Sequence, residues 1–344
     1  MPQSQDGQVG FITQPTVDVY KDPGAAIPND GIFMRLRSGS MNANRELLIP
    51  DPEIGGNRDV PDAVLGSASY SGEFEFYPRM ESITTLLAAA LGEVASVTNA
   101  GTVERDDANV THTITPVDGA ALPWLSVEEG LASSYESFGY TNVKVNTFHL
   151  ESDADGYLTG SVGLVATTQL AGITRTVAPS WDITPLMVGS QVVITVDGNS
   201  YSLRSFSIDI SNNLEDDVFV LGSITLSGIE EKRREITMGM SLRPTDSTLW
   251  RQAVYGTEVA TGPIAGAATK EAVAITITSF ENIYNTAVPY TMVINIPQAI
   301  LKPFENSASG DDVIENDIEI QAVRPAAGVD IMNVAITNGL LTVR

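Results

Sequence analysis

The stretch LGSASYSGEFEFYPRMESITTLLAAALG, residues 65–92, combines the sequence patterns of a strand and of a helix. Its first half alternates apolar and polar residues up to Phe76, which is typical of a strand with one buried face. Pro78 ends this strand, because proline cannot donate to the hydrogen-bond ladder. Beyond it, apolar residues recur at the spacing of one helical face, and Gly92 can close the helix. We therefore predict a strand followed directly by an amphipathic helix, whose core residues include Ile83, Leu86 and Leu87.

The same order of patterns recurs later in the chain. Leu221-Gly222-Ser223 repeats Leu65-Gly66-Ser67, and a second alternating strand ends at Pro244. A second helix follows, and its predicted core residues are Leu249, Trp250 and Val254. In both halves a further strand and a long strand pair come after the helix. The chain is therefore interpreted as two copies of one mainly β domain, in which Leu86 and Trp250 occupy equivalent buried positions.

The repeat sets the predicted domain boundaries. Residues 1–30, rich in proline and glycine, are expected to form an extended N-terminal arm that contacts another molecule. The first domain covers 31–180, a connector covers 181–190, and the second domain covers 191–344. Each domain is expected to be an antiparallel β-sandwich or barrel with one flanking α-helix.

The composition limits the possible functions. The 344 residues include 19 Lys and Arg against 43 Asp and Glu, a net charge of −24, and acidic residues are in excess in every third of the chain. Such a surface argues against wrapping nucleic acid, whose phosphates require basic side chains. The acidity serves either simple solubility or a functional acidic surface. The chain has no cysteine, which excludes disulfides and thiolate catalysis, and no apolar stretch approaches the roughly 18 residues of a membrane span.

Catalytic and metal-binding signatures are not apparent in the sequence. His112 and His149 lie in predicted strands, where a lone histidine is usually structural, and Asp153 and Asp155 suit a hairpin turn better than a calcium loop. There is no nucleophile elbow and no phosphate-binding glycine loop. Paired carboxylates such as Glu73 and Glu75 could in principle run glycoside hydrolysis, but in an acidic chain a solvated strand face is the simpler explanation. We expect no catalytic residue, no metal and no cofactor.

Three segments carry a family resemblance, namely GEFEFYPRMESITTLLAAALG, LPWLSV at 122–127 and GYLTGSVGL at 156–164. With their surroundings, from about 31 to 336, they resemble the tail tube proteins of long-tailed bacteriophages. The resemblance implies a β-sandwich flanked by a helix, with six such domains forming a ring whose inner sheets join into one barrel. Rings would stack head to tail into a hollow tube. Because the domain is duplicated here, three chains could supply one ring as a pseudo-hexamer; a ring of six chains is the alternative.

The resemblance also implies a structural, non-enzymatic role in the virion tail, after assembly in the host cytoplasm. The partners would be further copies of the chain, a tape-measure protein, tail-end proteins and double-stranded DNA in transit, which is not bound specifically; no membrane is involved. Alternate side chains of a strand point to opposite faces, and four carboxylates lie opposite the apolar face of their predicted strands. These candidates for an acidic channel lining that lets DNA slide are Glu75, Glu151, Asp209 and Glu319. The candidates for ring stacking and assembly are Phe11, Asp51, Pro52, Asp59, Asp311 and Asp312.

Two other classes of protein fit the sequence less well. One is a two-domain β adhesin or carbohydrate-binding module, which would stay a dispersed monomer. The other is an enzyme, for which the sequence offers only the carboxylate pairs.

Overall fold

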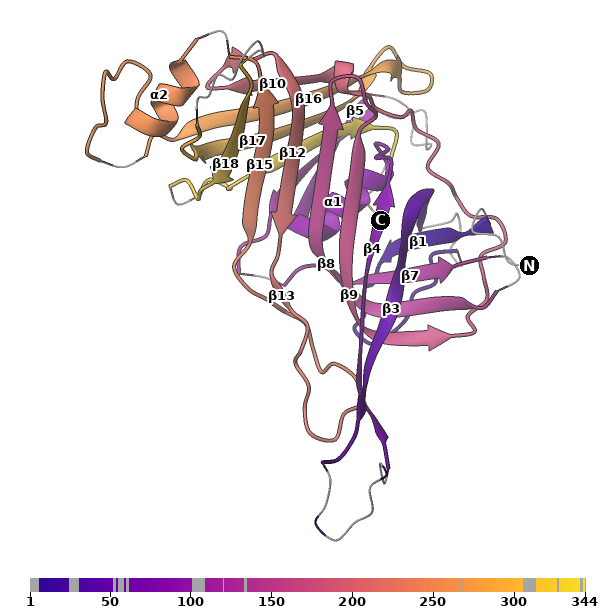
Figure 1. The fold of residues 1–344 in the computed structure, drawn as a ribbon. Coiled ribbons are helices and arrows are strands. Elements are labelled where there is room, and N and C mark those ends of the chain that lie inside the picture. The colour runs from indigo at the N-terminus through magenta and orange to yellow at the C-terminus, as the bar shows by residue number, and fades with distance from the viewer. Residues whose placement is uncertain are drawn as a thin grey trace.

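A computed structural model of the chain describes residues 6–24, 31–51, 54, 59, 62–100, 109–119, 121–132, 135–244, 246–266, 268–305, 314–326, 328–340 and 343. This part of the chain is mainly antiparallel β-structure with two α-helices (Figure 1). The expected fold class is therefore confirmed.

The elements of the first half are β1 (Gln8–Thr13), β2 (Ile32–Met34), β3 (Leu36–Leu48), β4 (Val64–Phe76), α1 (Ser82–Leu91), β5 (Gly92–Ala100), β6 (Asn109–Pro116), β7 (Leu125–Gly130), β8 (Ser137–Asp153) and β9 (Thr159–Ala171). Those of the second half are the 3-10 turn η2 (Gly189–Gln191), β10 (Val192–Val196), β11 (Asn199–Ser200), β12 (Leu203–Ser211), β13 (Leu214–Glu215), β14 (Glu230–Glu231), β15 (Glu235–Leu242), α2 (Thr248–Tyr255), β16 (Glu271–Asn282), β17 (Pro289–Leu301), β18 (Asn316–Ala322) and β19 (Asn333–Asn338).

The two halves connect their strands in the same order. In the first half β1 pairs with β7, β7 with β8, β8 with β9, β9 with β4 and β4 with β3. In the second half β10 pairs with β16, β16 with β17, β17 with β18, β18 with β15 and β15 with β12. The helix follows β4 in one half and β15 in the other. This repetition supports the two-domain interpretation, while the domain boundaries stay a prediction.

Two register shifts of the first half have counterparts in the second half. The register shifts between Leu36 and Ser38 in the β3–β4 pair, and between Leu203 and Ser205 in the β12–β15 pair. The β7–β8 pair has an extra residue on β8 just before Val143, and the β16–β17 pair has one on β17 just before Ala299. A bulge redirects a strand at a defined place and is a feature of a fold rather than a defect. Matching bulges therefore align the two halves residue by residue.

One sheet crosses from the first half into the second. Because β8 also pairs with β12, the strands β3, β4, β9, β8, β12, β15 and β18 lie side by side in that order; we call them the front sheet (Figure 1). Behind it, β19 pairs with both β17 and β6, so the end of the chain returns to the first half.

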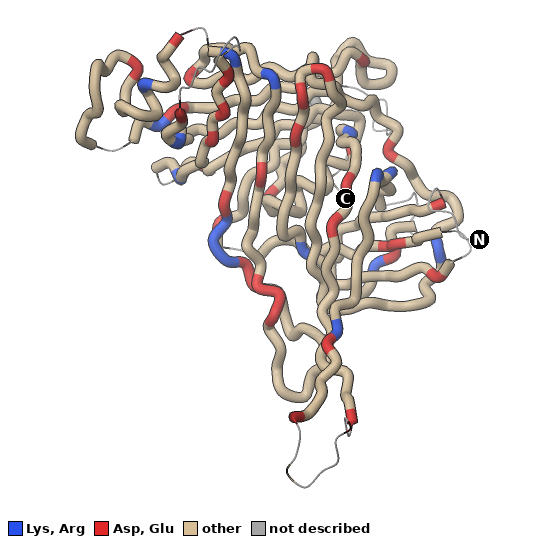
Figure 2. The backbone as a smooth tube through the Cα atoms, in the orientation of Figure 1, with Lys and Arg blue, Asp and Glu red and all other residues tan. Residues whose placement is uncertain are grey.

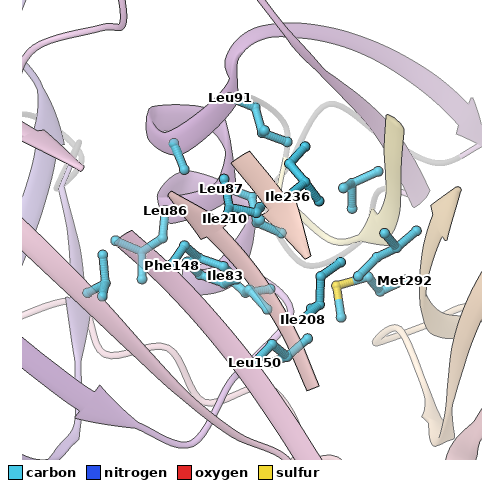
Figure 3. Packing of buried hydrophobic residues seen from close by; sticks show 14 of the residues in the cluster. Ile83, Leu86, Leu87, Leu91, Phe148, Leu150, Ile208, Ile210, Ile236 and Met292 are labelled. Carbon is cyan, nitrogen blue, oxygen red and sulfur yellow. The ribbon is translucent and has the colours of Figure 1, made fainter. Parts of the chain in front are cut away.

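Helix α1 fills the space between these layers. All ten of its residues are buried, and its Ile83, Leu86 and Leu87 face apolar side chains of β8 and β12 (Figure 3). The Asp182 carboxylate accepts a hydrogen bond of 2.7 Å from the Ser82 N–H at the start of the helix. Gly92 ends it with φ of 106°, a conformation that favours glycine. The predicted strand and helix of 65–92 are thus confirmed, together with the three predicted core residues of α1.

Helix α2 has a different environment from α1. Leu249 is buried, as predicted, but Trp250 and Val254 are only half-buried, so the expected equivalence of Trp250 and Leu86 is wrong. The reason is that α1 packs against β5 and β6 as well as β8, whereas the described part of the second half places only a loop between α2 and β16. α2 therefore lies at the periphery, where it packs against β17 (Figure 1).

One further expectation needs correction. The predicted N-terminal arm contains β1, which pairs with β2 on one side and β7 on the other, so this part of it belongs to the fold. The next long strand, β3, is continuous over 13 residues, because its partner β4 extends along nearly its whole length.

Candidate functional site: an acidic sheet face

The four predicted channel carboxylates lie on one face of the front sheet. Register pairing places Glu75, Ser161, His149 and Asp209 in a row across four neighbouring strands. A second row runs from Glu151 through Ser207 and Gly239 to Glu319. The sequence predicted the parity of each carboxylate; the structure shows that strands from both halves bring them onto a single surface.

We call this surface the acidic face, and its charged members include Glu73, Glu75, His149, Glu151, Asp209, Asp317 and Glu319. Figure 2 shows acidic positions on successive strands of the front sheet. The opposite face is apolar and belongs to the core, with Phe74, Leu150, Ile208 and Met240 all buried. Alternation along each strand therefore separates a buried apolar face from a solvated acidic one.

Hydroxyl groups hold several of these carboxylates in place. Ser161 donates a hydrogen bond of 2.6 Å to Glu73, and Thr159 donates one of 3.1 Å to Glu151. The Glu319 carboxylate instead forms an ion pair with Lys302. The side chains between the acids are mostly small and polar, so the charge of this surface is mainly negative.

His149 is the histidine of the acidic face. Its Nδ1 lies 2.6 Å from Asp209 Oδ1, and its Nε2 lies 3.4 Å from Glu151 Oε2. The hydrogen bond to Asp209 raises the pKa of His149, against the opposing effect of partial burial. The charged imidazole therefore stabilises the folded state fully at pH values below the pKa that His149 has in the unfolded chain. This stabilisation is lost as pH rises through its pKa in the folded state.

The other histidine has a structural environment. His112 is fully buried, its Nδ1 lies 2.8 Å from Ser96 Oγ, and its Nε2 lies 2.8 Å from the carbonyl oxygen of Leu340. Burial lowers its pKa. Among the residues that the structure describes, no group of three or more His, Cys, Asp or Glu side chains could hold a metal ion.

A second surface was not predicted as such: two segments extend together from the lower end of the front sheet (Figure 1). One segment is the far end of the β3–β4 hairpin, and the other is the segment between β12 and β15. A hydrogen bond of 2.8 Å from the Ala68 N–H to the Ile224 carbonyl joins them. We call the two segments the appendage. Its exposed apolar side chains are Leu47, Leu48, Ile49, Ile54, Val64, Leu65, Phe219, Val220, Leu221 and Ile224. The run Phe219–Val220–Leu221 inside a polar loop was the available sequence signal.

The predicted assembly residues are only partly brought together. Asp51 and Asp59 are exposed in the connection between β3 and β4, near the appendage. Phe11 was expected to contact another ring, which is wrong, because it is fully buried and packs edge-on against Phe74. Pro52, Asp311 and Asp312 lie outside the described residues.

Comparison with known families settles the class of protein. A family model for phage tail tube proteins matches residues 4–322. The chain belongs to the phage tail tube protein family. A search of curated proteins finds no match to it. Tail tube proteins are structural rather than enzymatic, and the family implies a location in the virion tail. In the described part of this tail tube protein, neither helix has the length and hydropathy needed to cross a bilayer.

A buried lysine ties the appendage of this tail tube protein to its first half. Lys144 on β8 is 2% exposed, and its Nζ lies 2.5 Å from Glu231 Oε1 and 3.0 Å from the Ile229 carbonyl. The same ammonium lies 3.9 Å from the ring centroid of Trp124, a cation–π contact. Burial raises the pKa of Glu231, but the hydrogen bonds from Lys144 and from the Leu122 N–H outweigh it and leave that pKa below its usual value.

Replacing Lys144 by methionine is expected to loosen the segment between β12 and β15. The Ile229 carbonyl and the Glu231 carboxylate both lose the ammonium as a donor, although Glu231 keeps its hydrogen bond from the Leu122 N–H. Because the Glu231 side chain is 29% exposed, water compensates in part. We expect a loss of about 2 kcal/mol in the free energy of unfolding and faster hydrogen exchange in that segment. Lys232→Met is the matched control, since the Lys232–Glu215 pair is exposed at 3.5 Å and is worth little. Equal exchange in both variants would contradict the role of Lys144.

Proposed function

We propose that three copies of this chain close into a ring in which six equivalent domains form one barrel. The observation that carries the proposal is the front sheet, where two halves with the same strand order and the same bulges are already joined edge to edge. In the described residues β3 has β4 as its only strand partner, so one edge of the front sheet is open. Repeating a head-to-tail contact closes a ring when the rotation permits, and closure removes open sheet edges.

The acidic face lines the channel of this ring in the proposed arrangement. The apolar face of the front sheet is occupied by the core, which leaves the acidic face to meet solvent or DNA. Double-stranded DNA carries a phosphate charge about every 1.7 Å along its axis. A lining of carboxylates repels those phosphates, and DNA would pass without being held.

The appendage supplies the contact between stacked rings. Its exposed apolar side chains come from both halves, so a ring of three chains carries several such projections on one side. Exposed apolar patches of this kind mark surfaces that bind another protein. Stacked rings would form the tail tube, assembled in the host cytoplasm with a tape-measure protein inside and tail-end proteins at its ends.

The number of chains in the isolated ring tests this proposal. We expect native mass spectrometry to give three chains, and electron microscopy to show six similar domains around a central channel. A ring of six chains would overturn the three-chain arrangement while leaving the tube function intact. A chain that stays a dispersed monomer under every assembly condition would instead favour an adhesin.

A further inference from the structure

The chain contains an internal example of the contact that its ring requires. Where the two halves meet, β8 and β12 pair in continuous register from Ser205 opposite Asp153 to Ser211 opposite Thr147. On the acidic face this seam places His149 opposite Asp209, and on the buried face it places Phe148 opposite Ile210. A contact between chains that repeats this geometry would use the strands equivalent to β12 and β8.

The shared bulges identify those strands. β3 is equivalent to β12, because the shift at Leu36/Ser38 matches the shift at Leu203/Ser205. β17 is equivalent to β8 by the bulge before Ala299 and Val143, which also makes Leu301 equivalent to Val145. Counting onward from these anchors, Phe304 corresponds to Phe148 and Glu305 to His149.

The two equivalent strands differ beyond Val145 and Leu301, where the β8–β9 register shifts between Val145 and Thr147. β8 continues beyond Val145 to Asp153, whereas β17 ends at Leu301 and residues 302–305 form no strand. Lys302 still donates its backbone N–H to the Glu319 carbonyl at 2.8 Å, which extends the β17–β18 register by one residue. Phe304 is half-buried and packs against the hydrophobic core, whereas its counterpart Phe148 is fully buried within that core. The segment therefore lies at the edge of β18 with its apolar side chain already turned inward.

We infer that residues 303–305 of one chain pair as a strand with β3 of a second copy, and that this seam joins the chains of the ring. The inference rests on the proposed ring. The register follows from the β8–β12 seam: Pro303 lies opposite Asn44, Phe304 opposite Ala43, and Glu305 opposite Asn42. A proline is tolerated at this position because it begins the new strand.

The side chains of β3 suit this partner. Asn42, Ala43 and Asn44 are exposed in the single chain, and Asn44 donates to Ser71 across the acidic face. On that face the amide of Asn42 can donate to the Glu305 carboxylate, as His149 contacts Asp209 in the internal seam. On the other face the small Ala43 leaves room for the ring of Phe304. No two carboxylates meet across the seam.

Disulfide formation between introduced cysteines can test this register, because the chain has no cysteine of its own. Opposed residues on antiparallel strands have Cα atoms about 4.5–5.5 Å apart, within the range of a disulfide, whereas diagonal neighbours are about 7–8 Å apart. The full-length variants N42C/E305C and N44C/P303C test the proposed register. N44C/E305C is the diagonal control, and H149C/D209C should close within one chain.

We expect both test pairs to give covalent species of up to three chains on non-reducing gels, and both controls to migrate as monomers. Electron microscopy of each variant under reducing conditions shows whether rings form. Rings in which the test pairs stay uncrosslinked, or in which N44C/E305C crosslinks better, would overturn this seam and leave the ring standing. If neither the variants nor the unmodified chain form rings, the proposed function fails and the seam with it.

Discussion

Replacing Leu86 by alanine is expected to cost about 3 kcal/mol or more in the free energy of unfolding, because it leaves a cavity among fully buried side chains. Leu86 has no exposed surface, and it packs between the front sheet and the strands behind it (Figure 3). Trp250→Ala is the comparison variant in the second helix. It removes a half-buried ring whose aromatic neighbour is Tyr255 at 5.0 Å between centroids, and should cost only about 1 kcal/mol.

Urea unfolding of the unassembled chain, followed by circular dichroism, measures both losses. The comparison tests whether the two helices have different roles despite their similar sequence patterns. Equal losses from the two variants would mean that α2 is as well covered as α1, in conflict with its place at the periphery. A loss below about 1 kcal/mol for Leu86→Ala would contradict the packing of α1 itself.

The sequence pattern predicted β4 and α1 correctly, because neighbouring residues largely determine both elements. The alternation up to Phe76, the proline after it and the apolar stripe beyond are sufficient to specify β4 and α1, and the structure confirms both. The strand face predicted for the four candidate channel carboxylates was also correct, because a strand has only two faces. That one sheet gathers all four depends on the β8–β12 pairing, which no local pattern shows.

The errors come from partners that are distant in the sequence. Phe11 lies in a short run after a proline-containing start, and it is buried because β2 and the distant β7 pair with its strand and its ring packs against Phe74. β3 carries polar residues on both faces, so alternation could not show its length. Trp250 lies on the apolar stripe of its helix, as Leu86 does. The β5–β6 hairpin that covers α1, however, has no described counterpart beside α2.

Neutralising the acidic face is the prediction with the largest expected effect on function. In the variant E75Q/E151Q/D209N/E319Q, four charges per chain are removed from side chains that point away from the core, so rings and tubes should still form. Loss of the repulsion lets phosphates approach the wall, and we expect DNA release from phage carrying this tube to slow several-fold at low ionic strength. Because screening lengths fall to about 10 Å at 0.1 M salt, the difference should shrink as salt is added.

The control must remove the same charge elsewhere. D197N/E258Q/E281Q/D330N neutralises four exposed carboxylates that lie off the front sheet and outside the appendage. If the acidic face lines the channel, release kinetics should change in the first variant and stay near normal in the control, while tube diameter is the same in both. Equal slowing would assign the effect to net charge, and unchanged kinetics in both would place the acidic face outside the path of DNA. The salt dependence separates these cases further, because the effect of distant charges disappears once the screening length falls to about 10 Å, whereas charges that line the channel keep part of their influence.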